Sequence, residues 1–266
     1  MIKLIATDMD GTFLDDKGQY DKERFRRLLK RLKQRGIVFV GASGRSLLAL
    51  ERLFSDVVSD MAFVAENGAA VLVDDSLSYE QTLAKEQYLE IVALLESSPY
   101  MTGKSYLLSG QKGAYVSQDA DKAYIDFISH YYDNLMLVSS FEEVNDSIYK
   151  LTANFEADNL SEAQQWVSDR LAYATAVTTG FQSVDIILKT VTKQTGLEHL
   201  CQKLGISKEE VMAFGDNLND YEMLRFVGLP LATSNAKDEI KAISQDVIGH
   251  CNDNAVISYI EEFLNA

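Results

Sequence analysis

Apolar runs that stop at polar residues alternate with helical patterns at the start of the chain. Residues 2–6 form a nearly continuous apolar run that leads to Asp8, as expected of a strand buried on both faces of a parallel sheet. Apolar side chains then recur at helical spacing over residues 25–32, and Gly36 follows where a helix would end. Residues 37–40 are the next apolar run. This order of strand, helix and strand predicts a parallel α/β sheet.

Further strands are predicted on both sides of the middle of the chain. The apolar runs 62–65 and 69–73 flank Glu66-Asn67-Gly68, a turn signal that indicates a hairpin. The run 211–214, which ends in Gly215-Asp216, and the run 229–232 predict two more strands. Helical patterns follow each of them.

The segment from residue 82 to residue 183 differs in character from the rest. Its apolar runs are shorter, with a strand-like stretch at 105–117 and helix-like stretches at 120–132 and 161–173. The buried-strand pattern resumes at 184–188. We therefore predict an inserted α+β domain over residues 82–183. It interrupts a parallel-sheet core formed by residues 1–81 and 184–266.

Composition narrows the class of protein. The chain has 266 residues, 47% of them hydrophobic, and a formal net charge of -15. This charge would repel nucleic acid and anionic membranes, so we expect neither as a partner. Cys201 and Cys251 lack metal-ligand spacing, and no apolar run reaches the roughly 18 residues of a membrane span. We expect a cytoplasmic protein that is a monomer or a weak homodimer.

Three carboxylates lie where predicted strands end. Asp8 and Asp10 follow the first strand, and Asp216 follows the strand at 211–214. Ligands of open α/β sheets bind at the carboxyl ends of the strands, so these groups are placed for chemistry. Carboxylates alone would repel a phosphate ester, whereas an oxygen-rich site with a phosphate ligand suits Mg²⁺. If the three converge, Asp8 could attack phosphorus while Asp10 transfers protons.

Further residues could bind the phosphate group. Ser43 and the amide of Gly44 lie between a strand and a helix, where they can donate hydrogen bonds to phosphoryl oxygens. Lys193 precedes a helical pattern, where the helix dipole disfavours a cation, and it could neutralise charge on Asp8 and phosphate. Each signal has an ordinary explanation, such as a solvated lysine or a helix cap at Asn219 or Asp220. Their joint occurrence favours a phosphoryl-transfer site.

These stretches resemble the motifs of the haloacid dehalogenase superfamily of phosphatases, and within it the Cof-type sugar-phosphatase-like group with a large, C2-type cap. Asp8-Met9-Asp10-Gly11-Thr12 matches the first motif, Ser43-Gly44-Arg45 the second, Lys193 the third and Gly215-Asp216 to Asp220 the fourth. The resemblance implies a Rossmann-like core with an inserted cap. Residues 65–69 and 235–241 are also similar to recurrent stretches of that group, without a catalytic role.

The resemblance also implies a role for each matched residue. Asp8 would be the nucleophile that forms an aspartyl-phosphate, and Asp10 the general acid and base. Ser43 and Lys193 would bind phosphate, and Asn219 would orient it.

The resemblance further implies a metal site. Mg²⁺ would be held by Asp8, Asp216 and the backbone carbonyl of Asp10, with Asp220 supporting the metal ligands.

The function expected from these residues is Mg²⁺-dependent hydrolysis of a small phosphorylated metabolite, such as a sugar phosphate or a phosphorylated cofactor. A phosphomutase of the same fold is the nearest alternative. A signalling module that accepts phosphate has no need of an inserted domain of this size. A silent binder of phosphometabolites has no need of the proton donor Asp10.

Overall fold

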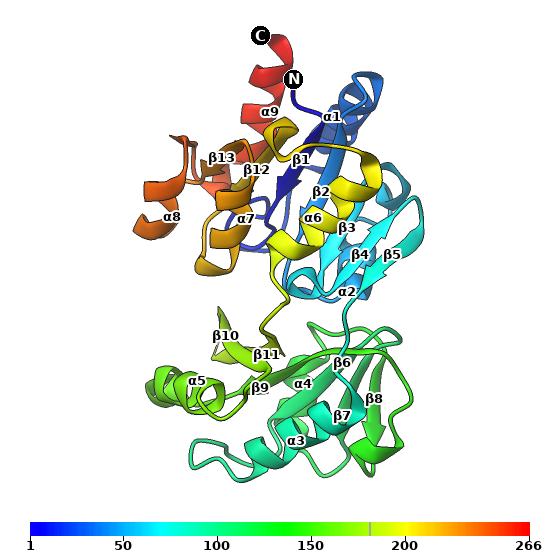
Figure 1. The fold of residues 1–266 in the computed structure, drawn as a ribbon, viewed down its shortest axis with the longest axis vertical. Helices are drawn as coiled ribbons and strands as arrows, with labels where there is room; N and C mark the ends of the chain where they lie inside the picture. The colour runs from blue at the N-terminus through cyan, green and yellow to red at the C-terminus, as the bar shows by residue number, and fades with distance from the viewer. Residues whose placement is uncertain (181) are drawn as a thin grey trace. The chain divides into compact units, whose positions relative to one another are not determined.

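The computed structural model describes residues 1–180 and 182–266 and divides into two compact units, each built on its own β-sheet (Figure 1). The first unit comprises Met1–Arg45, Leu53–Glu80 and Thr192–Ala266, and the second comprises Ser46–Arg52 and Gln81–Val191. The second unit is therefore inserted into the sequence of the first.

The first unit contains the strands of a mostly parallel sheet. They are β1 (Leu4–Thr7), β2 (Val38–Ala42), β3 (Ala62–Ala65), β4 (Ala70–Val73), β5 (Ser76–Glu80), β12 (Val211–Gly215), β13 (Leu229–Ala232) and β14 (Asp246–Val247). Within the described residues they form the order β14-β13-β12-β1-β2-β3-β4-β5. Neighbours from β14 to β3 run parallel, while β4 and β5 are antiparallel additions. The predicted hairpin is the pair β3 and β4.

Helices cover both faces of this sheet. They are α1 (Lys22–Gln34), α6 (Lys193–Leu204), α7 (Tyr221–Phe226), α8 (Asp238–Ile243) and α9 (Ala255–Asn265). The helix α2 (Leu47–Leu53) belongs, except for Leu53, to the second unit. Leu197, Leu224 and Ile240 of α6, α7 and α8 join Val40 and other strand residues in one core cluster. Figure 1 shows α6 and α7 in front of the strands. Phe39, next to Val40 in β2, points to the opposite face and packs on Phe25 of α1.

An aromatic cluster fixes the chain directly after the first carboxylates. Phe13 is 1% exposed. Its ring centroid lies 4.9 Å from that of Phe25, 5.7 Å from that of Phe39 and 6.0 Å from that of Phe54. Such packing holds the residues that follow the loop at 8–12 on the sheet, and so limits the freedom of the loop itself.

The second unit has a mainly antiparallel sheet. Its strands are β6 (Tyr106–Gly110), β7 (Ala114–Ser117), β8 (Leu135–Val138), β9 (Ile148–Asn154), β10 (Ala174–Gly180) and β11 (Ser183–Leu188), and its helices are α3 (Lys85–Glu96), α4 (Lys122–Ile128) and α5 (Leu160–Ser168). The described strands follow the order β10-β11-β9-β6-β7-β8, with only β7 and β8 parallel. A parallel-sheet core with an inserted α+β unit confirms the predicted fold class.

The strand at 184–188 belongs to the second unit, which corrects its assignment to the core. It forms β11 and pairs with β9 and β10, and the boundary between the units lies at Thr192 rather than at residue 184. A central strand buried on both faces has the same apolar pattern in either sheet. The side chain of Asp185 shows to which sheet the strand belongs. It is 2% exposed and accepts hydrogen bonds from Lys150 (2.8 Å) and Thr152 (2.7 Å), both on β9 of the second sheet.

Other predicted segments of the middle block are shorter than expected. The strand-like stretch 105–117 is the hairpin of β6 and β7, and the two helix-like stretches end at Ile128 and Ser168. No helix among the described residues has both the length and the apolar character needed to cross a membrane.

Phe13→Ala should destabilise the protein, because it leaves a cavity among the rings of Phe25, Phe39, Phe54 and the half-buried Tyr20. We expect the free energy of unfolding to fall by about 3 to 5 kcal/mol in urea denaturation. Phe127→Ala is the matched control, since that ring is 39% exposed, and it should cost about 1 kcal/mol or less. Equal losses for the two variants would contradict the anchoring role of Phe13.

Candidate active site

The predicted site residues of the first unit gather at the carboxyl ends of three adjacent strands. Asp8 follows β1, Ser43 follows β2 and Asp216 follows β12, and the sheet order places β1 between the other two. The Asp8 N–H donates to the Phe214 carbonyl of β12 (3.0 Å). The parallel register therefore brings together side chains that lie far apart in the sequence.

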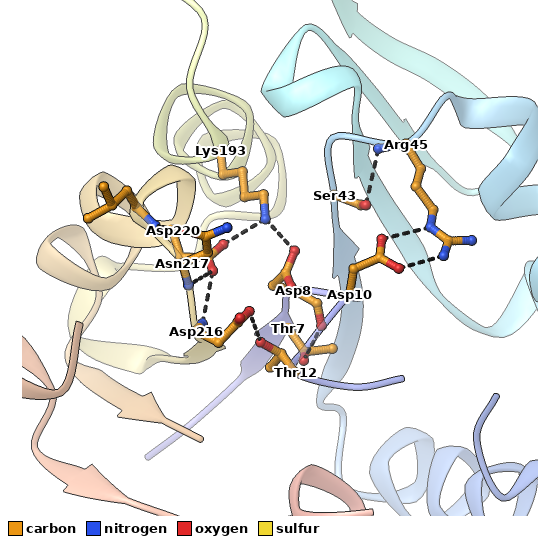
Figure 2. A network of polar contacts seen from close by, with 11 residues as sticks. Thr7, Asp8, Asp10, Thr12, Ser43, Arg45, Lys193, Asp216, Asn217 and Asp220 are labelled. Carbon is orange, nitrogen blue, oxygen red and sulfur yellow. Dashed lines mark hydrogen bonds and ion pairs between the residues drawn. The ribbon is translucent and has the colours of Figure 1, made fainter. Parts of the chain in front are cut away.

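Lys193 is the centre of the cluster (Figure 2). It is the first residue of α6, and its side chain is fully buried. Its ammonium group donates to Asp8 Oδ1 and to Asp220 Oδ1, the second at 2.6 Å. A buried ammonium is stable only beside anionic partners, and here it has two.

Asp216 and Asp220 are joined by a network of backbone and side-chain hydrogen bonds. Thr12 donates its hydroxyl to Asp216 Oδ1 (2.8 Å), which ties the first motif to the fourth. Asp220 Oδ2 accepts from the backbone N–H groups of Asp216 (3.0 Å) and Asn217 (3.1 Å). Asp220 is fully buried and thus holds both the lysine and the loop that carries Asp216.

The cluster holds three carboxyl groups and one ammonium group, and their proximity shifts the pKa values. Burial raises the pKa of Asp8 well above its ordinary value; Lys193 opposes this shift, and Asp220 and other nearby carboxylates add to it. Burial also raises the pKa of Asp216 to about 6, with a further increase from Asp220 and a decrease from the Thr12 hydrogen bond. Burial alone would lower the pKa of Lys193, but Asp220 and Asp8 outweigh it and raise this pKa. Lys193 therefore stays charged.

This arrangement suits a divalent cation. One carboxylate oxygen from each of Asp8, Asp216 and Asp220 lies within 4.8 Å of the others. With all groups ionised, three carboxylates and one ammonium leave two excess negative charges. Asp220 already accepts three hydrogen bonds, so Asp8 and Asp216 are the carboxylates best placed to bind the metal.

Asp10 lies apart from this cluster. Its carboxylate is 57% exposed and forms a two-point ion pair with Arg45, with Nε to Oδ2 at 2.8 Å and Nη2 to Oδ1 at 2.5 Å. Figure 2 shows the Asp10 side chain turned toward Arg45 and away from Asp216. The side chain of Asp10 is therefore no part of the acidic cluster, which leaves its backbone carbonyl as the metal ligand to consider.

The remaining predicted residues divide into two groups. Ser43 is 1% exposed, and its Oγ accepts from the N–H of Arg45 (3.1 Å) at the edge of the site, with Gly44 between them. Asn219 is half-buried, and among the described residues its side chain has no hydrogen-bond partner. The structure thus brings Ser43 and Lys193 to the same strand ends as Asp8, and it gives Asn219 no comparable contact.

The sequence pattern predicted no role for Thr12 or Arg45, which the structure places in the site. Thr12 was visible in the first motif, but its bond to Asp216 spans 204 positions of the chain and has no local signal. Arg45 follows Ser43 by two residues, which excludes a serine nucleophile elbow, yet nothing in that spacing indicates a pair with Asp10.

A family model of haloacid dehalogenase-like hydrolases matches residues 5–260. The chain belongs to this family. The match confirms the resemblance and the predicted class of enzyme, a phosphatase of the haloacid dehalogenase type, and members of the family generally use a divalent metal.

Several relatives of this haloacid dehalogenase-like protein are known. It is 33% identical over 264 residues to a 5-amino-6-(5-phospho-D-ribitylamino)uracil phosphatase of Escherichia coli K12, covering 99% of this chain and 96% of that one. It is 26% identical over 268 residues to an HMP-PP phosphatase of Cronobacter sakazakii, covering 100% and 97%. The crystal structure of SMU.1108c from Streptococcus mutans UA159 matches with a TM-score of 0.91 and 30% identity over the full length of both chains.

The raised pKa of Asp216 predicts how the stability of the metal-free protein depends on pH. The folded protein binds more protons than the unfolded chain between the ordinary value of 3.8 and about 6. Stability should therefore fall as the pH rises through this window. Asp216→Asn removes one negative charge and should raise the melting temperature in EDTA at pH 7.5 by about 2 to 6 °C.

The control is Asp253→Asn, the same substitution at an exposed position. It should leave the melting temperature in EDTA within about 1 °C of wild type. A lower melting temperature for Asp216→Asn than for this control would contradict the excess of negative charge.

Proposed function

We propose that this protein is a Mg²⁺-dependent phosphatase that hydrolyses phosphate monoesters of small metabolites through an aspartyl-phosphate on Asp8. The observation that carries the proposal is the placement of Asp8, which has Lys193 on one side and Asp216 on the other. One ammonium and one metal ion would then flank the carboxylate and screen the charge of an incoming phosphate.

Asp8 has the properties of a nucleophile. It is 5% exposed, and its Oδ1 accepts a hydrogen bond from Lys193. The other carboxylate oxygen would be the one that attacks phosphorus. In the first step, the bond between phosphorus and the leaving oxygen breaks as Asp8 bonds to phosphorus. Lys193 and the Ser43 loop would bind the phosphoryl oxygens while this occurs.

The residues present fit Mg²⁺. All candidate ligands are hard oxygen donors, and the excess of negative charge is the kind that a divalent cation neutralises. Asp8, Asp216 and the Asp10 carbonyl would hold it. When bound, the metal would stabilise the negative charge on the phosphoryl oxygens.

Asp10 is proposed as the general acid and base. Its exposed carboxylate lies two residues after the nucleophile and outside the buried cluster, so it can reach a leaving group on the solvent side. It would give a proton to the leaving oxygen and later take one from the water that hydrolyses the aspartyl-phosphate. Arg45 holds this carboxylate in the present structure, so the pair would open or shift when substrate arrives.

The relatives suggest the substrate class. Their names describe phosphatases of an aminouracil ribityl phosphate and of HMP-PP, both small phosphorylated metabolites. We propose a substrate of the same kind, a sugar phosphate or a phosphorylated cofactor. The inserted second unit, as a cap, would supply its specificity.

Asp8→Asn should lower the rate of phosphate release by about ten-thousand-fold or more, since the amide does not attack phosphorus. The assay measures inorganic phosphate from a panel of phosphosugars, nucleotides and cofactor phosphates, with Mg²⁺ or with EDTA. Asp253→Asn is the control and should keep wild-type activity.

Wild-type release that persists in EDTA would contradict the metal requirement. Isomerisation of a sugar phosphate without phosphate release would instead identify a mutase. Near-normal release by a folded Asp8→Asn variant would exclude Asp8 as the nucleophile.

Asp10→Asn should affect substrates according to their leaving groups. An alkyl or sugar oxygen needs a proton to leave, whereas p-nitrophenolate leaves without one. We expect kcat/KM to fall by about a hundredfold or more for a sugar phosphate, and by much less for p-nitrophenyl phosphate. Equal losses for both substrates would show that Asp10 does not protonate the leaving group.

A further inference from the structure

The turn Glu66–Gly68 between β3 and β4 has an unusual backbone. Glu66 and Asn67 have φ angles of 53° and 58°, in the left-handed region that non-glycine residues rarely adopt. They are 1% and 2% exposed. The other non-glycine residues with left-handed φ among those described are at least partly exposed. A buried turn of this kind persists only where the surrounding structure holds it in place.

One side of the turn holds the loop that contains Ser43. The N–H of Asn67 donates to the Ser43 carbonyl (3.0 Å), and the N–H of Glu66 donates to the Arg45 carbonyl (3.0 Å). The Ser43 N–H is bound in turn by the Val64 carbonyl of β3 (2.9 Å). The backbone of this loop is thus fixed by the turn and by the strand before it.

These bonds determine the direction of the Gly44 amide. In a planar trans peptide the carbonyl and the N–H point in opposite directions. Because the Ser43 carbonyl faces Asn67, the Gly44 N–H points away from the turn. The side chain of Asn67 also packs closely against Gly44. If residue 44 had a Cβ atom, that atom would lie 2.9 Å from Asn67 Oδ1 and 3.3 Å from Nδ2. This close packing is a second restraint on the position of Gly44.

The other side of the turn contacts the start of α6. Gly68 has a φ of 109°, and a Cβ atom there would overlap the carbonyl group of Thr192, with 2.6 Å to its carbon. A Cβ atom on Gly196 of α6 would lie 2.9 Å from the Gly68 carbonyl oxygen. Thr192 directly precedes Lys193, so the turn reaches the backbone that carries the buried lysine.

We propose that the Glu66–Gly68 turn positions the phosphate-binding groups of the site, and that Asn67 is its positioning residue. The turn sets the Gly44 amide, from the loop after β2, at a fixed place relative to Lys193, from α6. This inference rests on the proposed phosphatase function and assigns a role to a motif that this function left unused.

Two substitutions at Asn67 separate the side chain from the backbone. Asn67→Gly removes the amide group and keeps a residue that adopts φ near 58° without strain. Asn67→Asp keeps the shape and adds a negative charge beside the phosphate-binding loop. Asp74→Gly is the matched control, because Asp74 also has a left-handed φ, of 53°, in an exposed turn of the same sheet.

The experiment measures KM and kcat for p-nitrophenyl phosphate and, by calorimetry with MgCl₂, the Kd for inorganic phosphate. For Asn67→Gly we expect KM and Kd to rise about fivefold to tenfold with little change in kcat. For Asn67→Asp the rise should be about tenfold or more, because the added charge repels phosphate. Asp74→Gly should match wild type.

A double-mutant cycle tests whether Asn67 acts through Gly44. Gly44→Ala should weaken phosphate binding, because its methyl group meets the Asn67 amide. The double variant Gly44→Ala with Asn67→Gly has room for this methyl group, so the two effects should be less than additive.

Several outcomes would overturn the inference. Wild-type KM and Kd in a folded Asn67→Gly protein would do so, as would full additivity in the cycle. A purely structural role would lower the melting temperature and the active fraction while leaving KM and Kd unchanged. If the wild-type protein releases no phosphate from any substrate, the proposed function fails, and the calorimetric Kd still tests the positioning role.

Discussion

The single ammonium group of Lys193 and the carboxylates around it are the constraint on which the rest of the site depends. Asp8 and Asp220 share this cation, and a carboxylate oxygen of Asp216 lies within 4.8 Å of an oxygen of each of them. Full burial of Lys193 makes each contact strong and makes the loss of either partner costly. When all four groups are ionised, the two excess negative charges give the cluster an affinity for a divalent ion that it would lack if the charges were balanced.

Such a cluster forms because the fold brings distant segments together rigidly. Thr12 binds Asp216 across 204 positions, and Lys193 binds Asp8 across 185. The parallel register of β12, β1 and β2 brings together the loops that follow these strands, and the rings around Phe13 hold the loop that follows β1. Because this rigid frame already orders the site, the binding of a ligand has a smaller cost in conformational entropy.

The sequence predicted the site better than it predicted the contacts within it. Asp8, Ser43 and Asp216 end apolar runs, and the ends of parallel strands meet at one edge, so their convergence follows from pattern alone. The Asp10 pair with Arg45 and the contact of Asn67 with Gly44 depend on side-chain direction, which hydrophobic periodicity does not encode. The strand β11 was placed in the wrong sheet because the run at 184–188 would suit a buried strand of either one.

The site lowers the stability of the metal-free protein, and packing elsewhere in the first unit offsets this loss. Burial of like-charged groups raises the pKa values of Asp8 and Asp216, which means that their ionised forms oppose folding until a cation binds. Glu66 and Asn67 add backbone strain of about 1 to 3 kcal/mol each. The aromatic rings around Phe13 and the apolar cluster beneath α6 offset these terms by burial of large side chains. Residues that take no part in the chemistry therefore stabilise the folded state, whereas the charged groups at the strand ends, where the chemistry takes place, destabilise it.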